Sequence, residues 1–168
     1  MGCHIMDVPI KALGIFDPFS IEASVPRVPY VADFTPAPVY EESCPPSSYV
    51  TYRFRPSKIN DSEVKMIWMD GGIRPSHPEI ITDKDQIGDN GILMLGENGL
   101  IWSDYYGVNA RLYIKGQKGA VEVGKISEIN SVEFGHQKHW VDAIKAGFGS
   151  EEHKNLTSNF DFAGPVSE

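Results

Sequence analysis

The chain has 168 residues and a formal net charge of −8, from 15 basic and 23 acidic side chains. This acidic balance disfavours nucleic acid as a partner, because binding to a phosphate backbone depends on clustered Lys and Arg. A hydrophobic content of 41% supports an ordinary core and argues against disorder, and no apolar run is long enough to span a membrane.

The first predicted element is a helix over residues 2–13, whose apolar set is Ile5, Val8, Ile10 and Leu13. His4 and Asp7 are three residues apart and therefore share one helix face. No capping residue precedes this helix, and residues 158–161 resemble the capped start of another helix with little chain after it. We therefore expect a single domain over residues 1–168 that is truncated at both ends.

Strands dominate the middle of the chain. A short strand over 20–25 leads into residues 26–47, which contain six prolines and are expected to form a long loop. Further strands are predicted at 49–55, 64–69, 91–96, 100–102 and 111–114.

The connections between these strands favour antiparallel pairing. Asn98-Gly99 is a strong hairpin signal, and Asp70-Gly71-Gly72 is typical of a turn. A helix over 133–146 follows, with Gly147 as its stop and an apolar set made of Phe134, Trp140, Val141 and Ile144. The pattern predicts an α+β fold: an open-faced, mainly antiparallel sheet with helices packed on one face.

His4 and Asp7 are the first candidates for chemistry. An imidazole can give or take a proton near neutral pH, so His4 is a candidate acid or base on a substrate hydroxyl. The alternative is a histidine that a backbone carbonyl satisfies at the helix start. Asp7 either orients His4 or holds a sugar hydroxyl, or it is a first-turn charge that the helix dipole favours.

The loops and strands add further candidates for substrate binding. Asp70 either reaches a ligand or ends its strand in a turn, and Arg74 and His77 either contact a substrate or are solvated loop residues. Aromatic residues in the second half either stack on a sugar ring or belong to the core: Trp102, Tyr105 and Tyr106.

A metal site is not expected. His136 and His139 are three residues apart on the predicted helix, whereas metal-binding helix pairs more often use i,i+4 spacing with a third ligand.

Several segments, taken in order, resemble the C-terminal domain of the Gfo/Idh/MocA oxidoreductases, particularly a bacterial subgroup. These segments are residues 2–7, 68–72, 90–99, 106–112, 135–147 and 158–165. The resemblance implies a sheet domain that receives a sugar or polyol and forms a homo-oligomer, beside a Rossmann domain that binds NAD or NADP. His4 matches the family's catalytic histidine, and the aspartate that accompanies it would precede Met1.

The nucleotide-binding half has no counterpart in this sequence. Gly88, Gly91, Gly96 and Gly99 do not have the Gly-x-Gly-x-x-Gly spacing, and neither a βαβ unit nor a Glu-Lys-Pro segment is present. We therefore expect no cofactor binding and no autonomous activity from this chain, and NAD or NADP only in a full-length parent.

Two alternatives stay open beside that function. The chain could be a non-catalytic carbohydrate-binding or self-associating module, or a gene fragment without a selected function. The compartment is also open between cytoplasm and periplasm, because an export signal would lie upstream of Met1.

Overall fold

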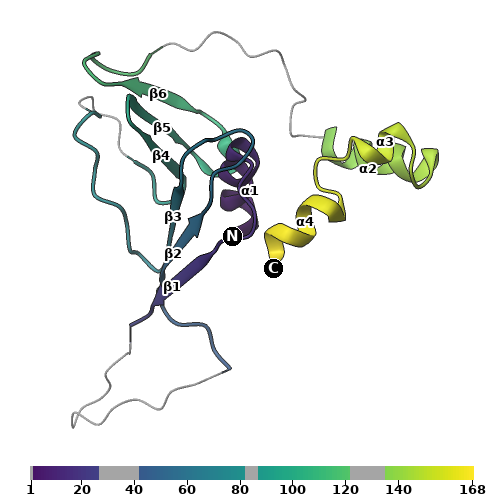
Figure 1. Cartoon of the computed structure of the whole chain (residues 1–168), viewed down its shortest axis with the longest axis horizontal. Coiled ribbons are helices and arrows are strands. Elements are labelled where there is room, and N and C mark those ends of the chain that lie inside the picture. The colour runs from purple at the N-terminus through teal and green to yellow at the C-terminus, as the bar shows by residue number, and fades with distance from the viewer. Residues whose placement is uncertain (1, 27–41, 82–86, 122–134) are drawn as a thin grey trace.

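The computed structural model describes residues 2–26, 42–81, 87–121 and 135–168 (Figure 1). The described chain has an α+β fold built from helices and antiparallel strands, as predicted. Its elements run in the order α1 (Gly2–Leu13), β1 (Ser20–Ser24), β2 (Tyr49–Phe54), β3 (Val64–Met69), β4 (Ile92–Gly96), β5 (Gly99–Ser103), η1 (Tyr105–Gly107), β6 (Arg111–Ile114), α2 (Gly135–Ala146), α3 (Glu151–Lys154) and α4 (Phe160–Ser167).

The described strands form two three-stranded antiparallel sheets, where the sequence predicts one. Their strand orders are β1-β2-β3 and β4-β5-β6, so β3 and β4 each have one neighbour. The predicted hairpin at Asn98-Gly99 is confirmed, because Gly96 pairs with Gly99 at the turn between β4 and β5.

The first sheet shares a core with α1 and α4. Ile10, Ile15 and Phe54 are buried there, and Phe162 and Val166 of α4 pack against them. α1 runs through Pro9 and ends where Gly14 takes a φ of +59°. The Ile15 N–H then donates to the Ile10 carbonyl at 3.1 Å, a six-residue closure that satisfies an otherwise orphaned helix carbonyl.

The second sheet has its own core. Ile81, Leu100, Trp102 and Tyr113 are buried together, and Tyr113 is 0% exposed. Each core therefore belongs mainly to one sheet, and the two hydrophobic clusters share no buried residue.

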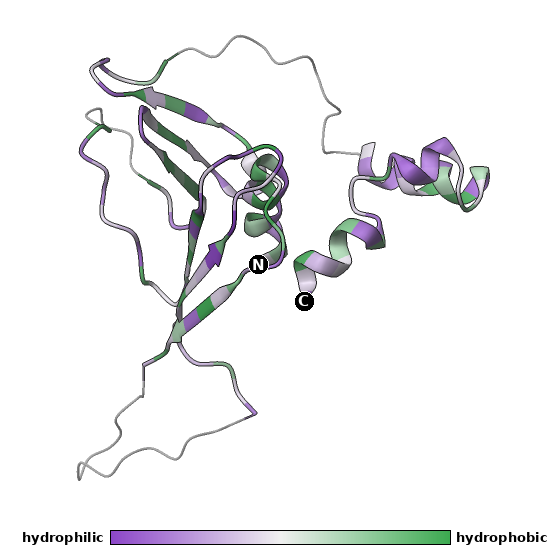
Figure 2. Cartoon of the chain, in the orientation of Figure 1, coloured by the Kyte–Doolittle hydropathy of each residue, from purple (hydrophilic) through white to green (hydrophobic). Residues whose placement is uncertain are grey.

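The helix predicted at 133–146 is described from Gly135 as α2, while residues 133 and 134 lie outside the described chain. Its apolar side chains do not form a core: Ala143 is buried, but Trp140 is 61% and Ile144 62% exposed. Figures 1 and 2 show why, because α2 and α3 stand away from both sheets, with α4 between them and α1.

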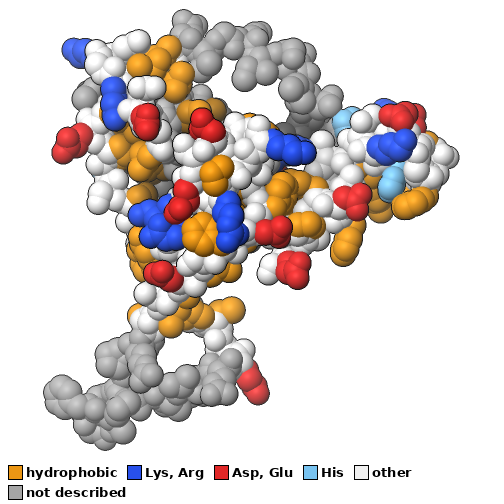
Figure 3. All heavy atoms as spheres, in the orientation of Figure 1, with side chains coloured by type: hydrophobic (Ala, Val, Ile, Leu, Met, Phe, Trp, Pro, Cys, Tyr) orange, Lys and Arg blue, Asp and Glu red, His pale blue; other side chains and the backbone are white. Residues whose placement is uncertain are grey.

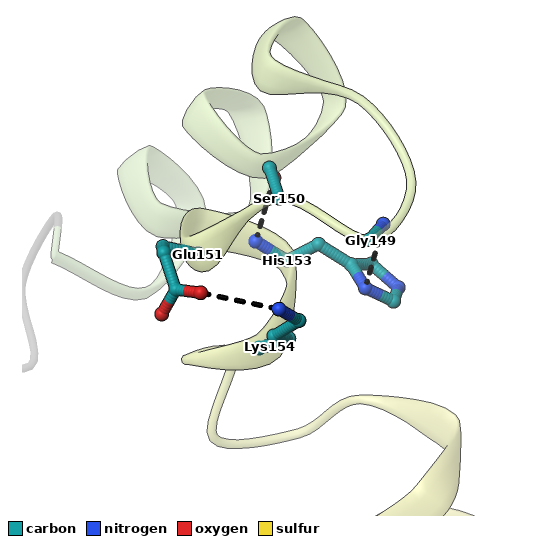
Figure 4. Close-up of polar contacts among 5 residues, drawn as sticks. All are labelled: Gly149, Ser150, Glu151, His153 and Lys154. Carbon is teal, nitrogen blue, oxygen red and sulfur yellow. Dashed lines mark hydrogen bonds and ion pairs between the residues drawn. The ribbon is translucent and has the colours of Figure 1, made fainter.

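The short helix α3 was not predicted. Ser150 caps it by accepting a hydrogen bond from the His153 N–H at 3.1 Å, and Lys154 pairs with Glu151 at 3.1 Å (Figure 4). Gly149 also donates to Nδ1 of His153 at 3.4 Å. These local contacts hold a single helical turn between α2 and α4.

Candidate functional site

The turn η1 packs against one face of α1. Gly107 has a φ of +71°, and a Cβ placed there would lie 3.2 Å from a methyl group of Val8. The absence of a side chain at this position therefore lets the turn approach the helix closely.

Tyr106, just before that glycine, has a left-handed backbone with a φ of +64°, and Asn109 has a φ of +53°. For a tyrosine this conformation costs about 1–2 kcal/mol, whereas asparagine adopts it more readily. Such a cost persists where the surrounding structure holds the backbone in place, and it is frequently associated with functional sites.

Asp104 holds this turn together. Its carbonyl accepts from the Gly107 N–H at 3.1 Å, and its own N–H donates to the Val108 carbonyl at 3.0 Å. Its carboxylate accepts a hydrogen bond of 2.7 Å from the Asn109 side chain. Three hydrogen bonds on one residue thus fix the segment that carries Tyr106.

Three rings meet where the turn contacts α1. The rings of His4 and Tyr106 lie edge to face with their centroids 4.9 Å apart, and the ring of Tyr105 lies 4.9 Å from that of Tyr106. His4 is exposed, and the two tyrosines are 46% and 49% exposed. We call His4, Tyr105 and Tyr106 the aromatic cluster.

Asp7 lies one helical turn after His4 and is half-buried. Across the described ranges its carboxylate makes no hydrogen bond or ion pair, so no contact orients His4 through Asp7. Its oxygens keep their capacity to accept a hydrogen bond from a ligand hydroxyl.

Arg74 and His77 belong to a different surface. They help to line a groove of about 1570 Å³ that also takes in β3 and β4. α1 contributes Ile5, Met6 and Pro9 to this groove, whereas neither His4 nor Asp7 lines it. The α1 residues that line the groove and the α1 residue in the aromatic cluster therefore lie on different faces of the helix.

One exposed ion pair lies at the groove. Arg74 forms an ion pair with Asp89, and both side chains are more than half exposed. Exposed pairs of this kind contribute little to stability, so the Arg74 guanidinium can be drawn toward another anionic group at low cost.

Asp70 is engaged within its own turn. Its carboxylate accepts hydrogen bonds from Nε1 of Trp68 at 2.8 Å and from the Ser48 hydroxyl at 2.7 Å, and also from the Ser48 N–H. The hydrogen bond from Trp68, followed by that from Ser48, lowers the pKa of Asp70 below its ordinary value of 3.8. This geometry favours the turn interpretation over a ligand contact.

The five predicted site residues thus fall into three places: the aromatic face of α1, the groove, and the turn after β3. Tyr105 and Tyr106 were candidates from the sequence for stacking on a sugar ring. The sequence pattern did not indicate the strained backbone on which these rings lie. The signal available was the spacing of Gly107 and Asn109, residue types that tolerate a left-handed backbone. Trp102, the third stacking candidate, is 6% exposed and belongs to the core.

Two other kinds of site can be compared with the described residues: a metal site and a dinucleotide site. His136 and His139 line a small pocket of about 270 Å³, and the described residues contain no group of three metal-ligating side chains. All strand pairs in the described sheets are antiparallel, whereas a dinucleotide-binding βαβ unit is built on parallel strands.

The surface charges and the hydropathy of the helices also bear on the kind of partner. Figure 3 shows acidic and basic side chains interspersed over the visible face. None of the described helices has the length and apolar character needed to cross a membrane. Comparison with protein-family models finds no match to the chain, and comparison with curated proteins finds none either.

Proposed function

We propose that this chain is the substrate-binding and oligomerisation domain of an NAD(P)-dependent sugar or polyol oxidoreductase of the Gfo/Idh/MocA type. The observation that carries the proposal is His4, an exposed imidazole on the first turn of α1 beside two half-exposed tyrosine rings. The ordered motifs that resemble the family support it, and so does the antiparallel α+β fold.

In this function His4 acts on a hydroxyl of the bound sugar. Its imidazole takes the hydroxyl proton when the alcohol is oxidised and returns it in the reverse direction. Asp7, without a partner among the described side chains, accepts a hydrogen bond from a neighbouring hydroxyl. In this proposal NAD or NADP is bound outside this chain, by the Rossmann domain of a full-length parent.

The test is ligand-observed saturation-transfer NMR on the 168-residue chain with two probes, methyl β-D-glucopyranoside and sorbitol. We expect at least one probe to bind, NAD to leave that binding unchanged, and His4→Ala to weaken it. His136→Ala is the matched control, because His136 is an exposed helical histidine outside the aromatic cluster. Absence of saturation transfer to both probes would contradict the proposal.

Oligomerisation through the sheets is supported by exposed apolar residues on their strands. The side chain of Ile21 in β1 is 58% exposed and that of Leu95 in β4 is 72% exposed. Burying these apolar side chains against a second copy of the chain would remove them from water, which favours association. Sedimentation velocity over a range of concentrations tests this. Ile21→Lys or Leu95→Lys should shift the chain toward monomer, whereas Ile59→Lys, in the exposed loop after β2, should not.

A purely self-associating module is the second candidate, favoured by a separate group of exposed side chains near α2. Trp140, Ile144, Phe148 and Phe160 are between 61% and 95% exposed. The second candidate replaces the first if three results hold together. The chain must form dimers, it must bind neither probe, and the Ile144→Lys variant must be monomeric.

A further inference from the structure

The backbone at Tyr106 is unusual for a tyrosine. A φ of +64° is readily available to glycine, yet a large ring is present at this position. The Asp104 hydrogen bonds and the close approach of Gly107 to Val8 hold the turn in place. A glycine at position 106 would satisfy the same backbone with less strain, so the ring itself is the feature that needs an explanation.

The position of the Tyr106 ring explains why a tyrosine is present there. Tyr106 lies between His4 and Tyr105, with both ring-centroid distances at 4.9 Å, and about half of each tyrosine remains open to solvent. The planes are inclined by 69° and 57°, so the three rings do not form a flat stack. They form an angled, partly solvent-exposed surface that a ligand can contact.

We infer that the aromatic cluster is a platform for the flat C–H face of a cyclic, neutral sugar, placed so that a ring hydroxyl reaches His4. This inference rests on the proposed function and names its substrate class. Aromatic faces carry partial negative charge and attract the partly positive hydrogens of a pyranose ring. Tyrosine rings also offer rigid contact area at a low cost in conformational entropy.

Open-chain polyols fit this platform poorly. They have no flat C–H face, and ordering their backbone torsions costs entropy that a closed ring does not lose. The platform therefore discriminates by ring closure, whereas His4 and Asp7 act on hydroxyls that both classes carry.

The experiment compares dissociation constants for methyl β-D-glucopyranoside and sorbitol in the 168-residue chain and its Tyr106→Gly, Tyr105→Ala and Phe148→Ala variants. Tyr106→Gly removes the ring and keeps the left-handed backbone, so this variant should stay folded with a melting temperature close to that of the parent. We expect it to weaken glucoside binding about tenfold, and sorbitol binding much less. Phe148→Ala is the control, because Phe148 is 95% exposed after α2.

The outcomes separate this inference from the function beneath it. Selective loss of glucoside affinity in Tyr106→Gly and Tyr105→Ala would support the platform. If glucoside binding survives both substitutions, or if sorbitol alone binds, the platform is overturned while the sugar or polyol function stands. If neither probe binds the parent chain, the platform and the proposed function are both overturned.

Discussion

Ser48 and Asp70 close one end of the first sheet through reciprocal hydrogen bonds. Ser48 donates to the Asp70 carboxylate through its N–H and its hydroxyl, and the Asp70 N–H donates back to the Ser48 carbonyl at 3.1 Å. The first pair of this sheet's β2–β3 ladder, Tyr49 with Met69, lies directly beside this closure. The end of the ladder is thus fixed by side chains as well as by backbone pairing.

Asp70→Asn should lower the stability of the chain at neutral pH. The pKa of Asp70 is lowered in the folded state, so the folded chain binds fewer protons at this site than the unfolded chain does. The stabilisation is therefore present above the ordinary value of 3.8 and is lost as the pH falls through the folded pKa. Urea unfolding at a series of pH values measures it.

The difference between parent and Asp70→Asn should shrink toward acidic pH. Asp61→Asn is a suitable control, because Asp61 is exposed and its carboxylate accepts a hydrogen bond of 3.2 Å from the neighbouring, exposed Ser62 hydroxyl. A stability difference for Asp70→Asn that stays constant over the acidic range would show that charge at this site does not stabilise the fold.

Gly71→Ala should destabilise the chain far more than Gly72→Ala. Both glycines have a positive φ, which costs alanine about 1–2 kcal/mol in either place. A Cβ on Gly71 would also lie 2.1 Å from the Pro46 carbonyl oxygen, whereas a Cβ on Gly72 would meet nothing within 4 Å. We expect the clash to add about 1–3 kcal/mol, measured by chemical denaturation. Equal losses for the two variants would contradict the packing of Pro46 against this turn.

Leu100→Ala should cost about 2–5 kcal/mol in the free energy of unfolding, because Leu100 is 4% exposed within the second core. Leu95 pairs with Leu100 across the hairpin but is 72% exposed. Leu95→Ala should therefore stay within about 0.5 kcal/mol of the parent in the monomer. Thermal and urea unfolding of dilute samples check this, and a large loss from Leu95→Ala would place that side chain in a core.

Ser57→Ala should cost about 1 kcal/mol or somewhat more in the free energy of unfolding. The Ser57 hydroxyl donates to the Leu13 carbonyl at 2.6 Å, at the end of α1. It also accepts from the N–H groups of Ile59 and Asn60 at 3.1 and 3.0 Å. Ser62→Ala, an exposed serine beside the same loop, should have little effect on urea unfolding. Similar effects of the two variants would mean that Ser57 does not tie the loop to α1.

The strands were predictable because their signals are local. The strand predicted at β2 and the Asn98-Gly99 turn both depend on residues close together in sequence, and the structure confirms both. The division into two sheets was not predictable, because it depends on which edges pair across long stretches of chain. α3 was missed because a single helical turn has too few residues for a periodic pattern.

The candidate site was predictable only in part. His4 was identified by resemblance, but its neighbours come from a turn more than a hundred residues later, and sequence alone does not show that α1 and η1 meet. Tyr106 was named for its ring, while its left-handed backbone depends on hydrogen bonds around Asp104. The separation of the groove from His4 likewise depends on how α1 packs in the folded chain, which the sequence alone does not show.

The core shared by α1 and α4 also bears on the order of synthesis. Phe16, just after α1, contacts Phe162 of α4 at a ring-centroid distance of 5.8 Å, and α1 leaves the ribosome long before α4 has been made. The β4–β5–β6 sheet, by contrast, is built from consecutive strands and can close while translation continues. On the ribosome, the helix that carries His4 is therefore made before α4 and is fully packed only once α4 has followed it.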